Sequence, residues 1–243
     1  NYGDIPFILS IEGDIGGNIP SGISFDPHQS IIEAVVPFGF NQEGYPINGI
    51  NVNGSPMITD LYGNSFPQIF FNADSIVYGK WISGFDVLGF PVHINSKVST
   101  SVAAGDIDRD NDKELIFGSE NGDLYVLNKD GSEFMMFSQA DQIVSYPVLY
   151  DFEQSNELEI LFITKNDSTS SVHVIDILGE YLNGFPMMIE GNLSNGAAIT
   201  DFDLDGLADI IVVSLDGALY AIQDDGSIRP GFPIVLPSNV NTP

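Results

Sequence analysis

The sequence predicts an all-β protein built from repeated units of four short antiparallel strands. Three observations predict this class: the apolar segments have the length of strands, they are rich in Ile, Val, Phe and Tyr, and turn dipeptides such as Asn-Gly and Asp-Gly separate them. No helix is evident. The clearest unit lies near the middle of the chain.

That unit begins with a predicted strand at 101–105, which an acidic loop at 106–114 follows. Two further strands at 114–117 and 123–127 are separated by Asn121-Gly122, and Asp130-Gly131 follows the third strand. Both dipeptides favour tight hairpins because they tolerate positive φ. The last unit repeats the same order with strands and turns at 197–200, 209–213, 216–217, 218–222 and 225–226.

The fourth strand of each unit is predicted from a proline that apolar residues follow. This proline recurs at Pro6, Pro46, Pro91, Pro186 and Pro233. Four of the five follow a glycine and an aromatic residue, at 44–45, 89–90, 184–185 and 231–232, and Met135-Met136-Phe137 fills the missing slot. The regular recurrence favours packing between units over a ligand site for these Gly-aromatic pairs.

The acidic loops have the same rhythm. Their first acids are Asp60, Asp106, Asp151 and Asp201, which are 46, 45 and 50 residues apart, and Asp26 begins a shortened first copy. Units of this size cannot bury both faces alone, and radial stacking of such units gives a β-propeller.

We therefore expect a single propeller domain over 1–243 with five blades visible. The innermost strands are predicted near residues 20, 56, 101, 146 and 197. The predicted repeat units are 6–45, 46–90, 91–136, 137–185 and 186–232, with 233–243 as the last outer strand and tail. Six outer strands against five innermost ones indicate a piece of a larger ring, or an irregular blade that closes the ring.

Composition excludes several function classes. The chain has 34 acidic and seven basic residues and a formal charge of −27, which repels nucleic acids and anionic membrane surfaces. It has no cysteine, so disulfides and thiolate metal sites are excluded. No apolar stretch has the length of a spanning helix, so membrane insertion is not expected. The first residues lack the features of a signal peptide, and we expect a mature or excised segment.

Two acidic loops carry the chemistry. The first reads Asp-Ile-Asp-Arg-Asp-Asn-Asp-Lys-Glu at 106–114, and the second reads Asp-Phe-Asp-Leu-Asp-Gly-Leu-Ala-Asp at 201–209. Acids at positions 1, 3, 5 and 9 of a turn direct several oxygens at one centre. Ca²⁺ takes six to eight oxygen ligands, so it is the expected ion. An EF-hand is excluded because position 12 is Phe117 or Val212, inside a predicted strand, where that loop requires a glutamate.

The loops and their flanking strands resemble the FG-GAP repeat of integrin α-subunits and the VCBS-type repeats of secreted bacterial proteins. The resemblance is strongest at 99–131 and 195–232, moderate at 145–186 and weak before residue 60. It implies a Ca²⁺-binding loop between the first and second strands of a blade, with position 7 contributing a backbone carbonyl.

The resemblance implies these ligands: by side chain Asp106, Asp108, Asp110, Glu114, Asp201, Asp203, Asp205 and Asp209, and by backbone carbonyl Asp112 and Leu207. Gly206 would supply the sharp turn, and Asn111 replaces it in the other loop. A weaker site is implied at Asp151, Glu153, Ser155, Glu157 and Glu159. The loop that begins at Asp60 has lost most of its charge and is expected to be vestigial.

No catalytic arrangement is recognised. The three histidines, His28, His93 and His173, lie in different units, and the conspicuous carboxylate pairs belong to the acidic loops. We expect a calcium-stabilised, secreted or cell-surface module for adhesion or ligand recognition. An unknown protein or glycan would bind at a propeller rim, and the ion would be structural. The alternatives are the propeller of a secreted polysaccharide-active enzyme, and an accessory domain that serves other domains of a larger exported protein.

Overall fold

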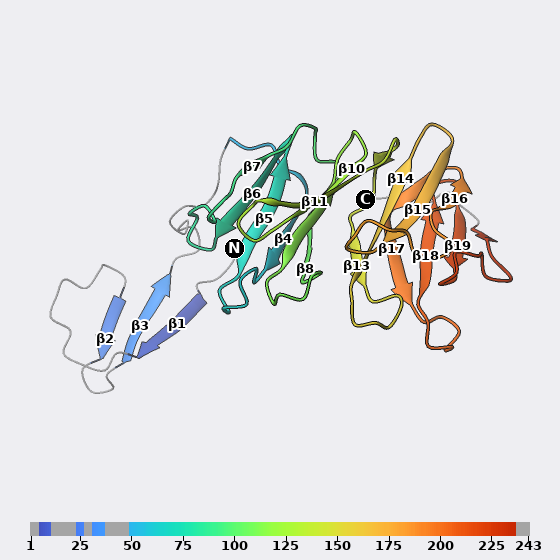
Figure 1. The fold of residues 1–243 in the computed structure, drawn as a ribbon. Helices are drawn as coiled ribbons and strands as arrows, with labels where there is room; N and C mark the ends of the chain where they lie inside the picture. Colours follow the sequence, from blue (N-terminus) through green and yellow to red (C-terminus); the bar gives the residue numbers. More distant parts are fainter. Residues whose placement is uncertain (1–4, 11–22, 27–30, 37–48, 237–243) are drawn as a thin grey trace. The chain divides into compact units, whose positions relative to one another are not determined.

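The repeated strand signals form five antiparallel sheets in this computed structural model, which describes residues 5–10, 23–26, 31–36 and 49–236 (Figure 1). Contacts divide the chain into two compact units, residues 1–47 and 48–243. Within the described ranges there is no helix, and hence none long and apolar enough to cross a membrane.

The described residues of the first unit form a three-stranded sheet and not a blade. Its strands are β1 (Ile5–Ser10), β2 (Ile23–Asp26) and β3 (Ile31–Val36), and their order in the sheet is β1-β3-β2. The prediction of five blades is therefore wrong, because the described residues form four. Residues 26–34, where the acidic loop of a first copy would begin, contain only Asp26 and Glu33 as acids. The innermost strand predicted near residue 20 lies outside the described residues, as do Pro46 and the tail beyond residue 236.

The second unit contains the four blades, and each is an antiparallel meander. Blades 1 and 2 consist of β4 (Asn53–Thr59), β5 (Gln68–Ala73), β6 (Ile76–Trp81) and β7 (Val92–His93), and of β8 (Ala103–Gly105), β9 (Glu114–Gly118), β10 (Asp123–Leu127) and β11 (Glu133–Ser138).

In blade 3, the short strands β12 and β13 both pair with β14. Blades 3 and 4 consist of β12 (Gln142–Ile143), β13 (Val148–Tyr150), β14 (Glu159–Lys165), β15 (Thr169–Ile175) and β16 (Met187–Glu190), and of β17 (Leu193–Thr200), β18 (Asp209–Ser214), β19 (Ala218–Ile222) and β20 (Ile234–Val235). The segments after Pro91, Pro186 and Pro233 are the outer strands β7, β16 and β20, and 135–137 lies in β11, as predicted.

The core lies between the blades, because the second strand of a blade buries both of its faces. In β14, Ile160 and Phe162 belong to the cluster shared with blade 2, whereas Leu161 and Ile163 belong to the cluster shared with blade 4. All four side chains are fully buried. A strand that is apolar on both faces needs a neighbour on each side, which is why the blades stack.

The Gly-aromatic-Pro segments pack between blades, as predicted. Phe90 and Phe185 are buried in the inter-blade cores. The preceding residues, Gly89 and Gly184, both have a φ of +88°. A Cβ at Gly89 would lie 1.7 Å from the carbonyl oxygen of Asp130 in blade 2, and one at Gly184 would lie 1.8 Å from that of Asp225 in blade 4. No side chain fits there, so these glycines are required for the blades to meet.

His173 is a structural residue of blade 3. It is 3% exposed, and its ring stacks on Phe162 with 4.6 Å between the centroids. Its Nε2 lies 2.8 Å from Thr164 Oγ1, and its Nδ1 lies 3.0 Å from the hydroxyl of Tyr181. Burial lowers the pKa of His173 to about 4, so the ring is neutral at pH 7.

We expect His173 to destabilise the fold in mild acid. The unfolded chain binds a proton near pH 6.5, whereas the native chain binds it only near pH 4. The free energy of unfolding should therefore fall as the pH falls through this window, by up to about 3 kcal/mol. Urea denaturation at pH 7 and pH 4.5, at fixed Ca²⁺, measures the fall. It should be smaller in His173→Gln, and an equal fall in both proteins would contradict this assignment.

Candidate metal sites

The four loops that join the first and second strands of the blades share one backbone shape. The side chain at position 9 accepts a hydrogen bond of 2.7–3.0 Å from the N–H of position 2 in every loop. Positions 4 and 6 have positive φ in every loop, and these residues are Gly63, Ser65, Arg109, Asn111, Gln154, Asn156, Leu204 and Gly206. The expected turn role of Gly206, and its replacement by Asn111, agree with these angles.

The loop at 60–68 keeps this shape without the charge. Its ninth residue is Gln68, whose Oε1 accepts a hydrogen bond from the N–H of Leu61, and Asp60 accepts hydrogen bonds from the N–H groups of Asn64 and Ser65. Hydrogen bonds alone therefore hold the loop. The other loops have more carboxylates than this one. These additional carboxylates are not needed to hold the backbone shape of the loop, so they need another explanation.

The loop at 106–114 brings three acids together. Ligand atoms of Asp106, Asp108 and Glu114 all lie within 4.8 Å of one another. Asp106 Oδ2 accepts a hydrogen bond of 3.1 Å from the N–H of Asn111, but its Oδ1 is buried and has no hydrogen-bond partner. A buried oxygen of a carboxylate without a partner is costly, and a bound cation would satisfy it.

The other two predicted ligands of this loop lie outside that cluster. Asp110 Oδ1 accepts a hydrogen bond of 2.8 Å from the N–H of Asp112, and the Asp112 carboxylate forms an ion pair with Lys129. This ion pair involves the side chain of Asp112. It does not involve the backbone carbonyl of Asp112, which is the group that the resemblance implies as a ligand. Asp110 would have to exchange its hydrogen bond for a metal contact.

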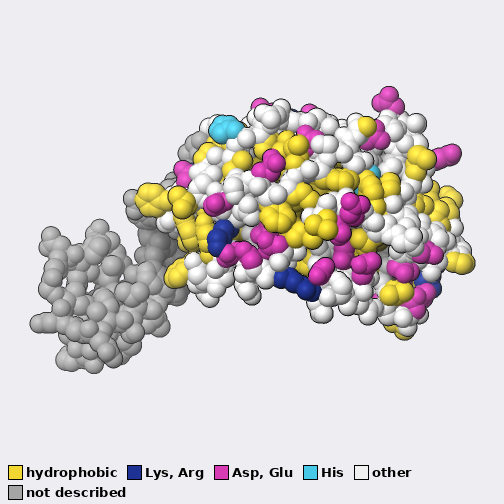
Figure 2. Space-filling view, viewed as in Figure 1, with side chains coloured by type: hydrophobic (Ala, Val, Ile, Leu, Met, Phe, Trp, Pro, Cys, Tyr) yellow, Lys and Arg dark blue, Asp and Glu magenta, His cyan; other side chains and the backbone are white. Residues whose placement is uncertain are grey.

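Negative charge is concentrated around Glu114, which is 2% exposed. Burial, which the hydrogen bond from the N–H of Ile107 opposes and the nearby carboxylates of Asp108, Asp110 and Asp106 reinforce, raises the pKa of Glu114 to about 7. Across the visible face of the molecule, acidic side chains far outnumber basic ones (Figure 2). A divalent cation in this loop would offset a repulsion that the fold otherwise carries.

The loop at 201–209 brings together the matching acids, but it also contains a cation. Ligand atoms of Asp201, Asp203 and Asp209 lie within 4.8 Å of one another. Arg229 Nη1 lies 2.7 Å from Asp203 Oδ2 and 3.5 Å from Asp209 Oδ2. The hydrogen bond from Arg229 lowers the pKa of Asp203. Asp205, the remaining predicted side-chain ligand, accepts a hydrogen bond of 2.8 Å from the N–H of Leu207.

Sequence reasoning missed Arg229, although the repeat contains a signal for it. The residue two positions before Gly231 is Arg229, and the same slot holds Val87 before Gly89 and Leu182 before Gly184. The backbone N–H of all three donates to the third strand of its own blade, so the slots are equivalent. Blade 4 thus has a guanidinium where blades 1 and 3 have an apolar side chain. Its positive charge lies beside the acidic loop at 201–209.

We expect Arg229→Leu to tighten Ca²⁺ binding at this loop by about tenfold, because it removes a positive charge that competes for two carboxylates. Terbium luminescence with Ca²⁺ competition measures the affinity. Arg109→Leu is the matched control, because Arg109 also lies in an acidic loop but donates to the carbonyls of Ser155 and Asn156 in the next blade. Equal affinities in wild type and Arg229→Leu would show that the guanidinium does not compete.

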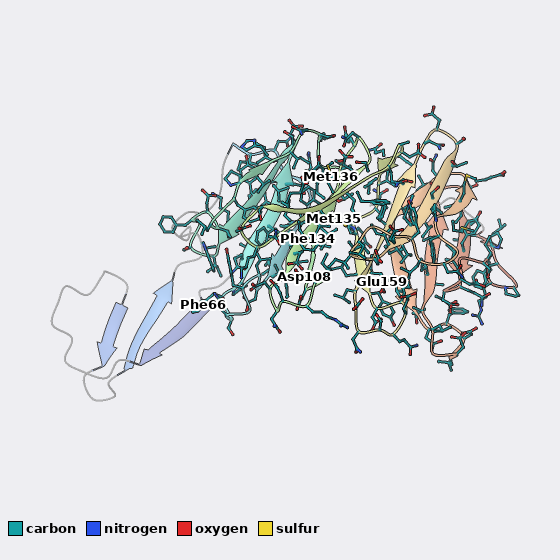
Figure 3. All side chains as sticks on the ribbon, viewed as in Figure 1. Phe66, Asp108, Phe134, Met135, Met136 and Glu159 are labelled. Atoms are coloured by element: carbon teal, nitrogen blue, oxygen red, sulfur yellow. The ribbon has the colours of Figure 1, made fainter. Side chains whose placement is uncertain are left out.

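The weaker predicted site differs in having no cluster of three converging acids among the described residues. Both oxygens of Asp151 accept backbone N–H groups, from Ser155 and Asn156 at 2.9 and 2.8 Å, as both oxygens of Asp201 accept those of Asp205 and Gly206. Glu157 pairs with Arg109, and Glu159 accepts a hydrogen bond from the N–H of Phe152. Among the described residues, no third acid joins a converging cluster here, and Glu153 lies outside one. Asp108 and Glu159 lie on the same side of blades 2 and 3, away from Met136 on β11 (Figure 3).

Known structures share this fold at low sequence identity. The crystal structure of BBS1N in complex with ARL6DN, soaked with lead, superposes with a TM-score of 0.57 at 12% identity, covering 78% of this chain and 56% of that one. The mercury-soaked crystal of the same complex gives a TM-score of 0.54 at 14% identity with the same coverage. The computationally designed Ika8 protein gives 0.51 at 15% identity, covering 78% and 51%.

These likenesses show the fold, which is a β-propeller. The chain spans about half the length of the structures it matches. No family model and no curated protein sequence matches the chain.

Proposed function

We propose that this chain is a calcium-stabilised β-propeller of the FG-GAP or VCBS type that acts as a non-catalytic recognition module. One observation carries the calcium half of the proposal: Asp106, Asp108 and Glu114 converge around a buried Asp106 oxygen that has no partner. The donor set is all oxygen, which is the set that Ca²⁺ prefers. The ion would join the end of the first strand to the start of the second and neutralise the loop.

The recognition half rests on the scaffold. Four blades hold their connecting loops rigidly at the two rims, and loops on a rigid scaffold are where binding residues concentrate. BBS1N, which shares the fold, is found in a complex with ARL6DN, and this supports a protein ligand; a glycan is the other ligand class that we propose. Adhesion at a cell surface is the role that fits both halves.

An extracellular location follows from the calcium requirement. Loops of extracellular modules bind Ca²⁺ with dissociation constants of about 10⁻⁴ to 10⁻³ M, so they fill only where free Ca²⁺ is millimolar. We place the chain in a secreted or surface protein on this ground. It would serve there either alone or beside other domains of the same exported protein.

We propose no catalytic role for the site. His173, the described histidine with polar partners, is buried and bonded to Thr164 and Tyr181, where no substrate reaches it. The converging carboxylates belong to the proposed metal loops. Turnover of an acidic polysaccharide that is lost when a residue outside the loops is changed would instead establish the enzyme alternative.

Thermal unfolding with and without free Ca²⁺ tests the proposal. A calcium-stabilised propeller unfolds at a lower temperature in chelator, whereas two superimposable transitions would refute the calcium half.

A further inference from the structure

The innermost strand of every blade is interrupted at the same place. In blade 1, Asn53 pairs with Asn72 and Met57 with Phe70, so residues 54–56 lie opposite a single residue. In blade 4, Leu193 pairs with Ser214 and Ala197 with Val212, which leaves residues 194–196 opposite one residue. Each first strand therefore has two extra residues. Such β-bulges re-aim side chains and are common beside binding sites.

Blades 2 and 3 have the same irregularity at the same level. Residues 99–102 lie between the pairs Val98–Ser119 and Ala103–Ile116, and residues 144–147 lie between Ile143–Thr164 and Val148–Leu161. In both cases four residues lie opposite two. The extra residues of all four blades thus gather where the innermost strands face one another.

Side-chain hydroxyls hold these bulges in a defined shape. The N–H of Gly118 donates to Thr100 Oγ1 at 2.9 Å, and the N–H of Ile163 donates to Ser145 Oγ at 2.8 Å, in place of strand hydrogen bonds. The N–H of Ser55 donates to Ser101 Oγ at 3.0 Å, which ties blade 1 to blade 2. These hydrogen bonds therefore hold the backbone of the bulges in a fixed conformation.

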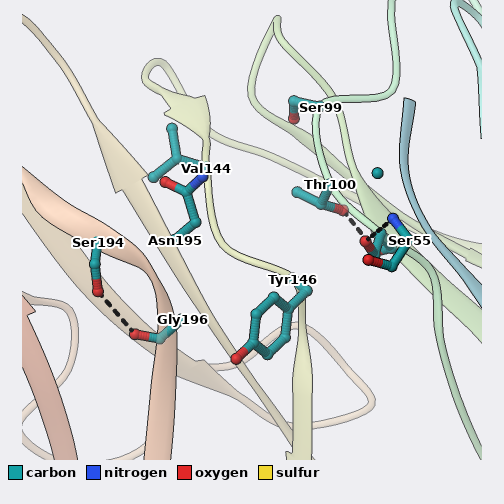
Figure 4. A pocket seen from close by; sticks show the side chains of 10 residues that line it. Ser55, Ser99, Thr100, Val144, Tyr146, Ser194, Asn195 and Gly196 are labelled. Atoms are coloured by element: carbon teal, nitrogen blue, oxygen red, sulfur yellow. Dashed lines mark hydrogen bonds between the residues drawn. The ribbon is translucent and has the colours of Figure 1, made fainter. Parts of the chain in front are cut away.

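Together the bulges line one pocket of about 400 Å³ (Figure 4). This volume lies within the range of small-molecule sites, about 300–1,000 Å³. All four blades contribute, and the lining side chains are hydroxyls, one amide, one tyrosine ring and one valine. None of them is charged, although the chain has a formal charge of −27.

Three polar groups of the lining are free to bind a ligand. Within the described part of the chain, no hydrogen bond engages the hydroxyls of Ser55 and Tyr146 or the side-chain amide of Asn195. Tyr146 is 47% exposed. Its ring packs on Gly196, where a Cβ would lie 2.5 Å from the tyrosine hydroxyl. Because Gly196 in blade 4 has no side chain, the exposed ring of Tyr146 from blade 3 can lie against its backbone.

The chemistry of the lining selects a class of ligand. A phosphate or an acidic sugar would meet a negative field and no lining cation, and a metal ion would find no lining carboxylate. An apolar compound would leave the free hydroxyl and amide groups unpaired. A neutral polyhydroxyl compound can both donate to and accept from these groups, and its C–H face can stack on the tyrosine ring.

We propose that this pocket binds a neutral saccharide, with one sugar ring on Tyr146 and hydrogen bonds to Asn195 and Ser55. The proposal rests on the recognition half of the proposed function and specifies its ligand class and its place on the fold. It moves recognition from an undefined rim loop to the point where the four innermost strands meet.

The test is saturation-transfer NMR and calorimetry on the full chain in millimolar Ca²⁺, with maltose, cellobiose, lactose and diacetylchitobiose as neutral probes and digalacturonate as the acidic probe. We expect saturable binding of at least one neutral disaccharide and none of digalacturonate. Tyr146→Ala should weaken it by about tenfold, because it removes the stacking face. Tyr146→Phe should retain most of the affinity, and Asn195→Ala, an exposed change, should weaken it several-fold.

Tyr150→Ala is the matched control, since Tyr150 is 40% exposed but lies outside the pocket lining. No binding of any neutral probe, or binding that Tyr146→Ala and Asn195→Ala leave unchanged, would overturn the proposal. A calcium-dependent melt of the same sample separates the two failures. If the melt depends on Ca²⁺ and no saccharide binds, the pocket proposal falls and the calcium-stabilised scaffold stands.

Discussion

Gly89→Ala is expected to lower the free energy of unfolding by about 4 kcal/mol or more, among the largest effects of any single methyl group in this chain. The added Cβ would lie 1.7 Å from the carbonyl oxygen of Asp130, so blades 1 and 2 would have to separate locally. The positive φ of +88° adds a cost of about 1 to 2 kcal/mol. Chemical denaturation of the purified variant measures the loss.

Gly231→Ala is the control because it separates the clash from the backbone strain. Gly231 is the equivalent residue of blade 4 and has a φ of +94°, but no atom of the described residues would lie within 4 Å of a Cβ added there. It should lose only the strain, about 1 to 2 kcal/mol. Equal losses at both positions would mean that the contact between blades 1 and 2 is not as tight as the structure has it.

Removal of Ca²⁺ by EGTA is expected to lower the melting temperature by about 10 to 20 °C. In about 10 mM Ca²⁺, a loop with a dissociation constant of about 10⁻⁴ M has a hundredfold excess of ion, which stabilises the native state by about 2.7 kcal/mol, and two loops have converging acids. For a domain of this size, 1 kcal/mol shifts the melting temperature by about 2 to 4 °C. Differential scanning calorimetry with Ca²⁺ and with EGTA measures the shift.

Matched variants locate the effect. Asp106→Asn removes a charge from a loop with a converging cluster and should reduce the calcium-dependent shift by about half. Asp60→Asn makes the same change in the loop whose ninth residue is Gln68, where no such cluster forms among the described residues, and should leave the shift unchanged. A shift that is reduced equally by both variants would point to general charge screening rather than to a bound ion.

Much of the fold could be predicted from the sequence because the repeat imposes it. The turn pairs, the proline-led outer strands and the loop positions recur in phase, and the structure places β9, β10, β18 and β19 where the pattern indicates. The first 47 residues continue the rhythm of prolines but lack the acidic loop, and the strands described among them, β1, β2 and β3, form a different sheet. Spacing alone therefore overestimated the number of blades.

The bulges were hidden for a different reason. Residues 101–105 read as one continuous strand, but β8 begins only at Ala103, and 99–102 belong to the bulge. Extra residues in one strand become visible only when its pairing partner is known. The predicted centres of the innermost strands near 56, 101, 146 and 197 thus fall at or beside the pocket.

In the metal loops, the sequence indicated the acids but not their competitors. The order of acids brings positions 1, 3 and 9 together in two loops, while position 5 is turned to a backbone N–H in Asp110 and Asp205. Arg229 reaches the loop at 201–209 from a segment 20 residues further along the chain. Its role follows from three-dimensional proximity, which the acidic pattern does not contain.

Calorimetric titration of Ca²⁺ into the metal-free full chain measures directly whether the acidic loops bind the ion. We expect two bound ions per chain, the tighter at 106–114 and the weaker at 201–209 beside Arg229, with one ion lost in Asp106→Asn and the other in Asp201→Asn. Absence of saturable binding, or an unchanged stoichiometry in both variants, would contradict it.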